Sequence, residues 1–290
     1  MDTGALIKSL RKERQLTQEE LAGTITTRTT LSSIENRNQT LSFDLLVKLL
    51  DRLNVRMEEF LFLLEEGKSS KKQAMYLEVY TDYYSKGTLS EEVESRILVE
   101  YEKTHDFYYL ALHTQMLGIE RRNKGNLSPE REKQLNNNVH KIKDHLNKVT
   151  HWNHMELALF MNCLFLFDTE YIQMAYKRTV KKLVFRKKLR LYQDDIVLFL
   201  LNCIDLFLER DEDELVGYFL QELDQHLVRK NQLYEKTLTH FYQVILDIRQ
   251  GKPQEIERII KILNYLEFIG ETKQVEDLKK DVEKYAGVVL

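Results

Sequence analysis

The sequence predicts an all-α protein, with a small helical domain at the N-terminus followed by a longer stack of helices. Three observations predict this class. Only two prolines and ten glycines occur in 290 residues, so residues that break helices are rare. Hydrophobic residues make up 43% of the chain and charged residues 31%, a balance typical of water-soluble proteins. Apolar residues also recur at helical spacing along most of the chain.

Residues 1–64 contain five short helical patterns, each with apolar residues on one face. These patterns begin near residues 3, 17, 27, 42 and 56. The second pattern opens with a capping box, in which the Thr17 hydroxyl accepts a backbone N–H and Glu20 reaches back to the backbone of Thr17. We therefore expect a five-helix N-terminal domain.

Residues 16–37, LTQEELAGTITTRTTLSSIENR, place a capped helix, a short polar turn and a second helix in succession. Small or aliphatic residues occupy the inward positions, as the fixed angle of a helix-turn-helix requires. The outward residues carry hydroxyl, amide and guanidinium groups, which suit phosphates and base edges in a major groove. The candidate DNA-binding residues are Gln18, Thr27, Arg28, Thr29, Thr30, Ser33 and Arg37. The alternative is a small helical bundle with a polar face.

The charge of this domain indicates modest affinity for DNA per subunit. Residues 1–56 contain nine Lys and Arg against seven Asp and Glu, a net charge of +2, and the whole chain carries −3. A homodimer that binds two half-sites about 34 Å apart would compensate for this weak charge. The expected partners are therefore double-stranded promoter DNA and a second copy of the chain.

The segment EEGKSSKKQ at residues 65–73 interrupts the apolar pattern and is predicted to be a linker. In the domain predicted behind it, residues 74–290, about ten helices with short connections are expected over residues 74–285. Ser128-Pro129-Glu130 and Gly251-Lys252-Pro253 mark two helix starts. This pattern favours antiparallel helix pairs stacked in a tetratricopeptide-like repeat, although the tetratricopeptide consensus itself is absent.

Amide side chains recur within apolar helices of this second domain. An Asn-Cys pair begins at Asn162 and again at Asn202, 40 residues later, and a further 41 residues reach Gln243. Upstream the spacing fails, because Gln115 lies 47 residues back. On the concave face of a helical repeat, such amides could bind the main chain of an extended peptide, with Phe165 and Leu166 on the same helical face as Asn162. The alternative is that the amides bond carbonyl groups between packed helices.

Several functional classes find no support in the sequence. It contains no glycine-rich phosphate loop, no H-E-x-x-H motif and no nucleophile in a recognisable setting, so we expect no catalytic residues and no cofactor. His140, His145, His151 and His154 lack a third ligand at suitable spacing, so we expect no metal. Cys163 and Cys203 are interpreted as reduced core thiols. No signal peptide is recognisable and the apolar runs are shorter than a membrane span, which predicts a cytoplasmic protein without membrane contact.

Two stretches resemble known families. Residues 5–61, with LTQEELA and SIEN, resemble the Xre/Cro-type helix-turn-helix. Residues 151–172, HWNHMELALFMNCLFLFDTEYI, are similar to the signature of the Rgg/GadR/MutR regulators of Gram-positive bacteria, in which a Trp precedes an E-L-x-L-F-x-N helix and an F-x-F tail. Domain order, length and helix spacing match as well. The resemblance implies a dimeric cytoplasmic transcription regulator, and many relatives sense a short secreted peptide that is taken back into the cell. It also points to Asn162 and Asn202 as ligand contacts, whereas Ser33 stands where some relatives have Arg or Lys.

The sequence therefore predicts a transcription regulator in which residues 1–64 bind DNA and residues 74–290 dimerise and sense a short hydrophobic signalling peptide, as in quorum sensing. Two alternatives remain: a regulator that responds to a metabolite or to acid, and a protein-interaction scaffold without a peptide ligand. The candidate dimer contacts, for which packing within one chain is the other interpretation, are Ile256, Ile259, Ile260, Leu263, Leu266 and Ile269.

Overall fold

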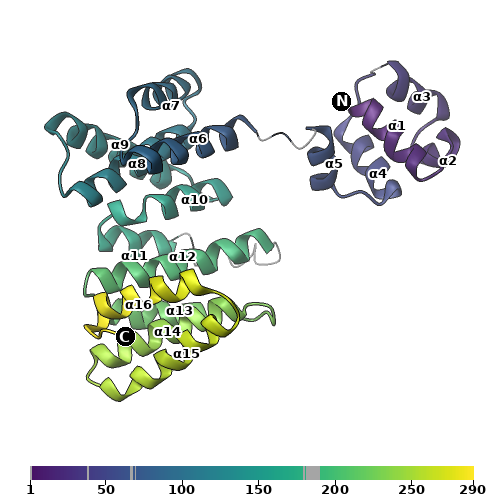
Figure 1. Cartoon of the computed structure of the whole chain (residues 1–290). Helices are drawn as coiled ribbons and strands as arrows, with labels where there is room; N and C mark the ends of the chain where they lie inside the picture. The colour runs from purple at the N-terminus through teal and green to yellow at the C-terminus, as the bar shows by residue number, and fades with distance from the viewer. Residues whose placement is uncertain (1, 38, 66–67, 69, 179, 181–189) are drawn as a thin grey trace. The chain divides into compact units, whose positions relative to one another are not determined.

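The computed structural model describes residues 2–37, 39–65, 68, 70–178, 180 and 190–290, and its regular elements are helices throughout these ranges. The all-α class is thus confirmed. The chain divides into two compact units, Met1–Thr81 and Asp82–Leu290 (Figure 1). The division falls inside helix α6 (Lys71–Lys86), beyond the linker predicted at 65–73. The predicted domain boundaries therefore stay a prediction.

The first unit contains the five predicted short helices. They are α1 (Thr3–Glu13), α2 (Gln18–Ala22), α3 (Arg28–Arg37), α4 (Phe43–Leu53) and α5 (Met57–Leu64). The predicted capping box of α2 is confirmed, because Thr17 Oγ1 accepts the Glu20 N–H at 3.1 Å and Thr17 N–H donates to Glu20 Oε2 at 2.7 Å. The buried faces of the five helices share one apolar core that extends from Leu6 to Phe60.

Helices α1 and α3 approach each other closely at Gly4. A Cβ atom added to Gly4 would lie 2.0 Å from the Ile34 carbonyl oxygen and 3.0 Å from the Ile34 carbonyl carbon. Only a residue without a side chain therefore fits at this contact. The absence of a side chain in the first turn of α1 places the N-terminus of that helix against the backbone of α3.

The second unit is a stack of helices that extends from α7–α9 at one end to α14–α16 at the other (Figure 1). Most helices that follow each other in the sequence pack on one another, and α10 also packs directly on α12. Its helices are α7 (Glu91–Thr104), α8 (Phe107–Lys124), α9 (Pro129–Lys148), α10 (His154–Asn162), α11 (Thr169–Arg178), α12 (Arg190–Glu209), α13 (Asp213–Asp224), α14 (Leu233–Arg249), α15 (Ile256–Phe268) and α16 (Thr272–Ala286), with the 3₁₀ turns η1 (Leu164–Leu166) and η3 (Pro253–Glu255). None of the described helices is both long enough and apolar enough to cross a membrane.

One continuous apolar core runs through this stack from α8 to α16. Trp152 is fully buried in it, with its indole N–H donating to the Leu146 carbonyl oxygen at 3.0 Å. Cys163 and Cys203 are buried free thiols, and burial raises the pKa of Cys163 to about 12. Both cysteines therefore act as small apolar residues in the packing.

The apolar residues proposed as dimer contacts divide into two groups. Ile259, Leu263 and Leu266 are buried in the core of the chain itself, and Ile256 is half-buried against it. Ile260 and Ile269 remain exposed, at 42% and 49% of their surface. Packing within the chain thus accounts for the first group, and only the second group is accessible to a second copy.

Candidate DNA-binding and ligand-binding sites

Helix α3 presents most of the predicted DNA-binding residues to solvent. Arg28, Thr29 and Arg37 are exposed, whereas Thr30 and Ser33 are half-buried. Thr27 precedes the helix and caps it, because its hydroxyl oxygen accepts the Thr30 backbone N–H at 3.1 Å. The hydroxyls of Thr27 and Thr30 also lie 2.9 Å apart. The first turn of α3 therefore has Arg28 and Thr29 as its outward-facing polar groups.

Gln18 takes part in a buried polar network that the sequence analysis missed. Its amide nitrogen donates to Glu35 Oε2 at 2.9 Å, and the Arg11 guanidinium donates to both carboxylate oxygens of Glu35 at 2.7 and 2.8 Å. Burial by itself raises the pKa of Glu35, but the hydrogen bonds from Arg11 and Gln18 outweigh it and hold this pKa below its ordinary value. The network joins α1, the start of α2 and α3, and so fixes the helix-turn-helix geometry. The only sequence signal for it is a pair of opposite charges on inward helix faces.

A hollow of about 230 Å³ brings together Asn162, Asn202 and Phe165, as the sequence analysis predicted. Asn162 is the last residue of α10, Phe165 lies in η1, and Asn202 lies on α12. Gln115, on α8, lines the same hollow even though it fails the 40-residue spacing. The full lining is Gln115, Arg122, Met161, Asn162, Leu164, Phe165, Asn202, Asp205, Leu206 and Glu209.

Two predicted ligand contacts lie elsewhere. Gln243 is half-buried on α14, a helix that does not contribute to the hollow, and Leu166 is half-buried against the core. The expectation of one helical face from Asn162 through Leu166 is wrong, because α10 ends at Asn162 and the 3₁₀ turn η1 follows. The tighter turn directs Phe165 into the hollow, whereas Leu166 packs on Gly118 and against the core.

The amides of this hollow do not bond neighbouring helices. Asn162 is exposed, whereas Gln115 and Asn202 are half-buried. Within the described part of the chain, none of these three side chains makes a hydrogen bond to another protein group. The arrangement in which the amides satisfy carbonyl groups between packed helices is therefore not observed.

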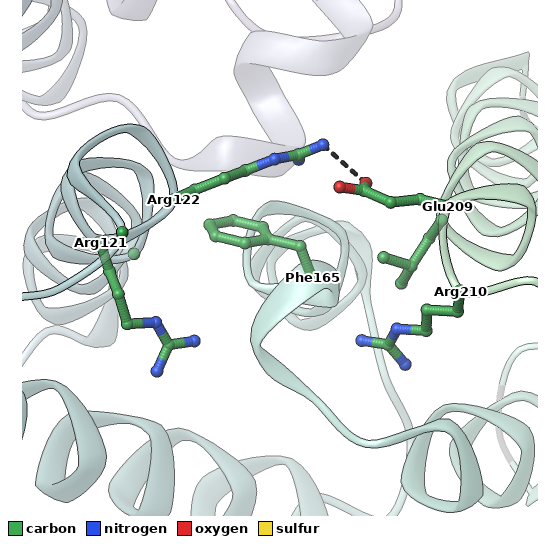
Figure 2. Close-up of a pocket in the computed structure, with 8 residues that line it drawn as sticks. Arg121, Arg122, Phe165, Glu209 and Arg210 are labelled. Atoms are coloured by element: carbon green, nitrogen blue, oxygen red, sulfur yellow. Dashed lines mark hydrogen bonds and ion pairs between the residues drawn. The ribbon is translucent and has the colours of Figure 1, made fainter. Parts of the chain in front are cut away.

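A second hollow of about 420 Å³ adjoins the first, because Arg122, Phe165, Leu206 and Glu209 line both. Together the two hollows form one open groove between α8, η1 and α12, which we call the α8–α12 groove. Figure 2 shows the Phe165 ring in the middle of the second hollow, below an ion pair between Arg122 and Glu209. Gly118 makes room for this ring and for Leu166, since a Cβ atom there would lie 2.9 Å from the ring and 2.8 Å from Leu166 Cδ2.

The histidines have individual contacts. His145 stacks on Phe107 with ring centroids 4.1 Å apart, and His154 Nδ1 lies 2.6 Å from Asp195 Oδ2. Among the residues that the structure describes, no three His, Cys, Asp or Glu side chains lie close enough together to hold a metal ion. The His154–Asp195 contact joins the start of α10 to α12 and so helps to position the groove.

A helix-turn-helix unit is typical of DNA-binding proteins, and in this chain a stack of helices with an open groove follows it. Comparison with known families identifies the class. Residues 89–280 match the family of the HTH-type transcriptional regulator Rgg, C-terminal domain, and residues 7–60 match a helix-turn-helix family. The chain therefore belongs to the Rgg family of transcriptional regulators.

Solved structures share this fold over nearly the whole chain. The SHP pheromone receptor Rgg2 of Streptococcus dysgalactiae matches with a TM-score of 0.74 at 18% identity, covering 97% of this chain and 99% of that one. PrgX in its complex with cCF10 matches with a TM-score of 0.77 at 16% identity, covering 98% and 92%. A protein from Listeria monocytogenes EGD-e matches with a TM-score of 0.80 at 17% identity, covering 97% and 96%. At these identities the matches establish a common fold.

Proposed function

We propose that this Rgg-family regulator controls transcription in response to a short peptide that binds in the α8–α12 groove. The observation that carries the proposal is the set of three amides, on Gln115, Asn162 and Asn202, which line one open groove without protein partners. An extended peptide presents N–H and C=O groups along its length, and an amide side chain can both donate to and accept from such groups.

Apolar side chains between the amides supply contacts for the side chains of the peptide. Met161, Leu164, Phe165 and Leu206 line the groove beside Asn162 and Asn202. Rgg2 is named a pheromone receptor, and PrgX has been solved with cCF10. The fold that this chain shares with both proteins supports a peptide as the class of ligand.

The DNA-binding half of the proposal rests on the first unit. Arg28 and Thr29 at the start of α3 face outward, where they can bond bases and phosphates of promoter DNA. Ser33 and Arg37 continue the same helix toward its end. A cytoplasmic homodimer would place two such helices on half-sites about 34 Å apart. Binding of the peptide would then favour one arrangement of the two DNA-binding domains over others.

Replacing Asn162 or Asn202 by Ala tests the proposal. Each lost hydrogen bond is expected to cost about 1 kcal/mol of peptide affinity, a weakening of about five-fold. Asn264→Ala is the matched control, because Asn264 is exposed on α15, outside the groove. Genome-wide mapping of bound sites, in the presence and absence of the strain's own secreted peptides, measures the response. Circular dichroism verifies that each variant is folded. Groove variants that respond to secreted peptides as fully as Asn264→Ala would overturn the proposal.

A further inference from the structure

The two ends of the α8–α12 groove differ in charge. The hollow beside Gly118 carries the guanidinium groups of Arg121, Arg122 and Arg210 against the single carboxylate of Glu209, a formal charge of +2. The hollow with the unbonded amides carries one guanidinium group against two carboxylates, a formal charge of −1. A ligand that lies along the groove therefore passes from a cationic end to an anionic end.

Arg210 forms no direct ion pair in the described structure, and the nearest carboxylate in its hydrogen-bond network is Glu212, which accepts from the Thr169 hydroxyl at 2.7 Å. The Arg210 guanidinium donates to the Thr169 hydroxyl at 3.0 Å and to the Phe167 carbonyl oxygen at 2.7 Å, and both of these acceptors are neutral. These bonds hold the group in place where it lines the hollow. A half-buried cation is attracted to a carboxylate more strongly than a fully hydrated cation is, because the local dielectric constant is lower. The resulting charge-assisted hydrogen bond is also stronger than the bonds to neutral acceptors.

Arg121 and Arg122 extend from α8 into the same space. Figure 2 shows the guanidinium groups of Arg121 and Arg210 on opposite sides of the hollow below the Phe165 ring. Arg121 pairs with Glu132 at 3.1 Å and Arg122 with Glu209 at 2.6 Å, and the arginine side chains are 35% and 50% exposed. Ion pairs with this exposure are weak and screened by salt, so a carboxylate of a ligand can compete for both arginines.

Resting on the peptide-binding function proposed above, we propose that this arginine end is the subsite for a carboxylate at one end of the peptide. The carboxylate lies between Arg121 and Arg210, and the main chain continues past Asn162 and Asn202. Asp205, which also accepts a hydrogen bond from the Tyr285 hydroxyl at 2.8 Å, repels a carboxylate from the opposite end of the groove. The arginines thus determine both the direction and the register in which the peptide binds.

Three labelled pools of short apolar peptides, randomised over Leu, Ile, Val and Phe, serve as probes for the full-length protein. The first pool ends in a free carboxylate, the second in an amide, and the third in Glu followed by an amide. Fluorescence anisotropy should show that the free-acid pool binds about ten-fold or more tightly than the amidated pool, as expected for charge-assisted hydrogen bonds. The third pool identifies the source of the carboxylate. The third pool should bind as tightly as the free-acid pool if the subsite accepts an acidic side chain. It should bind as weakly as the amidated pool if the subsite accepts only a terminal carboxylate.

Arg121→Gln and Arg210→Gln should each reduce the preference for the free-acid pool. Arg96→Gln, which removes a 48% exposed arginine on α7, should leave that preference unchanged. Added salt should also reduce the preference in the parent protein. If the free-acid and both amidated pools bind the parent equally, the carboxylate subsite is overturned while peptide binding stands. If no pool binds, the peptide-binding function itself fails, and this inference fails with it.

Discussion

Gly4→Ala tests whether the approach of α1 to α3 is as close as the structure shows. The added methyl carbon would lie 2.0 Å from the Ile34 carbonyl oxygen. Because the atom it meets belongs to the backbone, no side chain can rotate away, and α1 has to move by more than about 1 Å to reach an ordinary contact. Overpacking of this kind costs about 3 kcal/mol, of which the higher helix propensity of Ala offsets at most about 1 kcal/mol.

A net loss of about 2 kcal/mol or more in the free energy of unfolding is large for the first unit. A unit of its size is expected to have a free energy of unfolding of roughly 4–12 kcal/mol. Gly217→Ala is the matched control, because Gly217 lies within α13 and the nearest atom to an added Cβ is 3.7 Å away. The helix propensity of Ala should therefore stabilise the second unit by about 0.5–1 kcal/mol.

The single tryptophan, Trp152, is fully buried in the second unit, so its fluorescence reports the unfolding of that unit alone. Circular dichroism reports the helices of both units. In urea, Gly4→Ala should show an early loss of ellipticity with an unchanged fluorescence transition. Gly217→Ala should instead move the fluorescence transition to higher urea. The reasoning is refuted if the ellipticity curve of Gly4→Ala coincides with that of the parent.

Two further substitutions probe carboxylates, that of half-buried Asp281 and that of buried Glu35. Burial and the nearby Asp205 raise the pKa of Asp281 to about 6, so the parent protein loses stability as pH rises from about 4 to 6. At pH 7.5, Asp281→Asn should therefore be about 1–2 kcal/mol more stable than the parent, a figure already reduced for solvent screening. This gain in stability should shrink at pH 5. Stability is measured by Trp152 fluorescence in urea, and an equal gain in stability at both pH values would contradict this prediction. Glu35→Gln leaves the buried Arg11 without its counter-ion and should destabilise the first unit by about 3–5 kcal/mol. Ellipticity in urea measures this loss. A loss below about 1 kcal/mol would show that the ion pair is dispensable.

The helices and their starts were predictable because their signals are local. The capping box at Thr17 and the Ser128-Pro129 helix start depend on residues within one turn, and the structure contains both. The close approach at Gly4 and the burial of Glu35 were not predictable, because each depends on which face of a distant helix packs opposite. A glycine in a first turn and a charge among apolar residues mark such positions in the sequence without identifying the partner.

The candidate groove shows the same division between local and distant information. The 40-residue spacing places Asn162 and Asn202 together because α10 and α12 contact each other directly. Gln115 reaches the same groove from α8, but the 20-residue helix α9 lies between α8 and α10 and lengthens the step. Gln243, 41 residues after Asn202, comes close to this spacing and misses the groove, because α14 is not among the helices that line it. Residue spacing is therefore not sufficient to predict a shared site, because α14 also contacts α12 and yet does not line the groove. The charges of Arg121, Arg122 and Arg210 converge on one hollow through packing that no repeat in the sequence encodes.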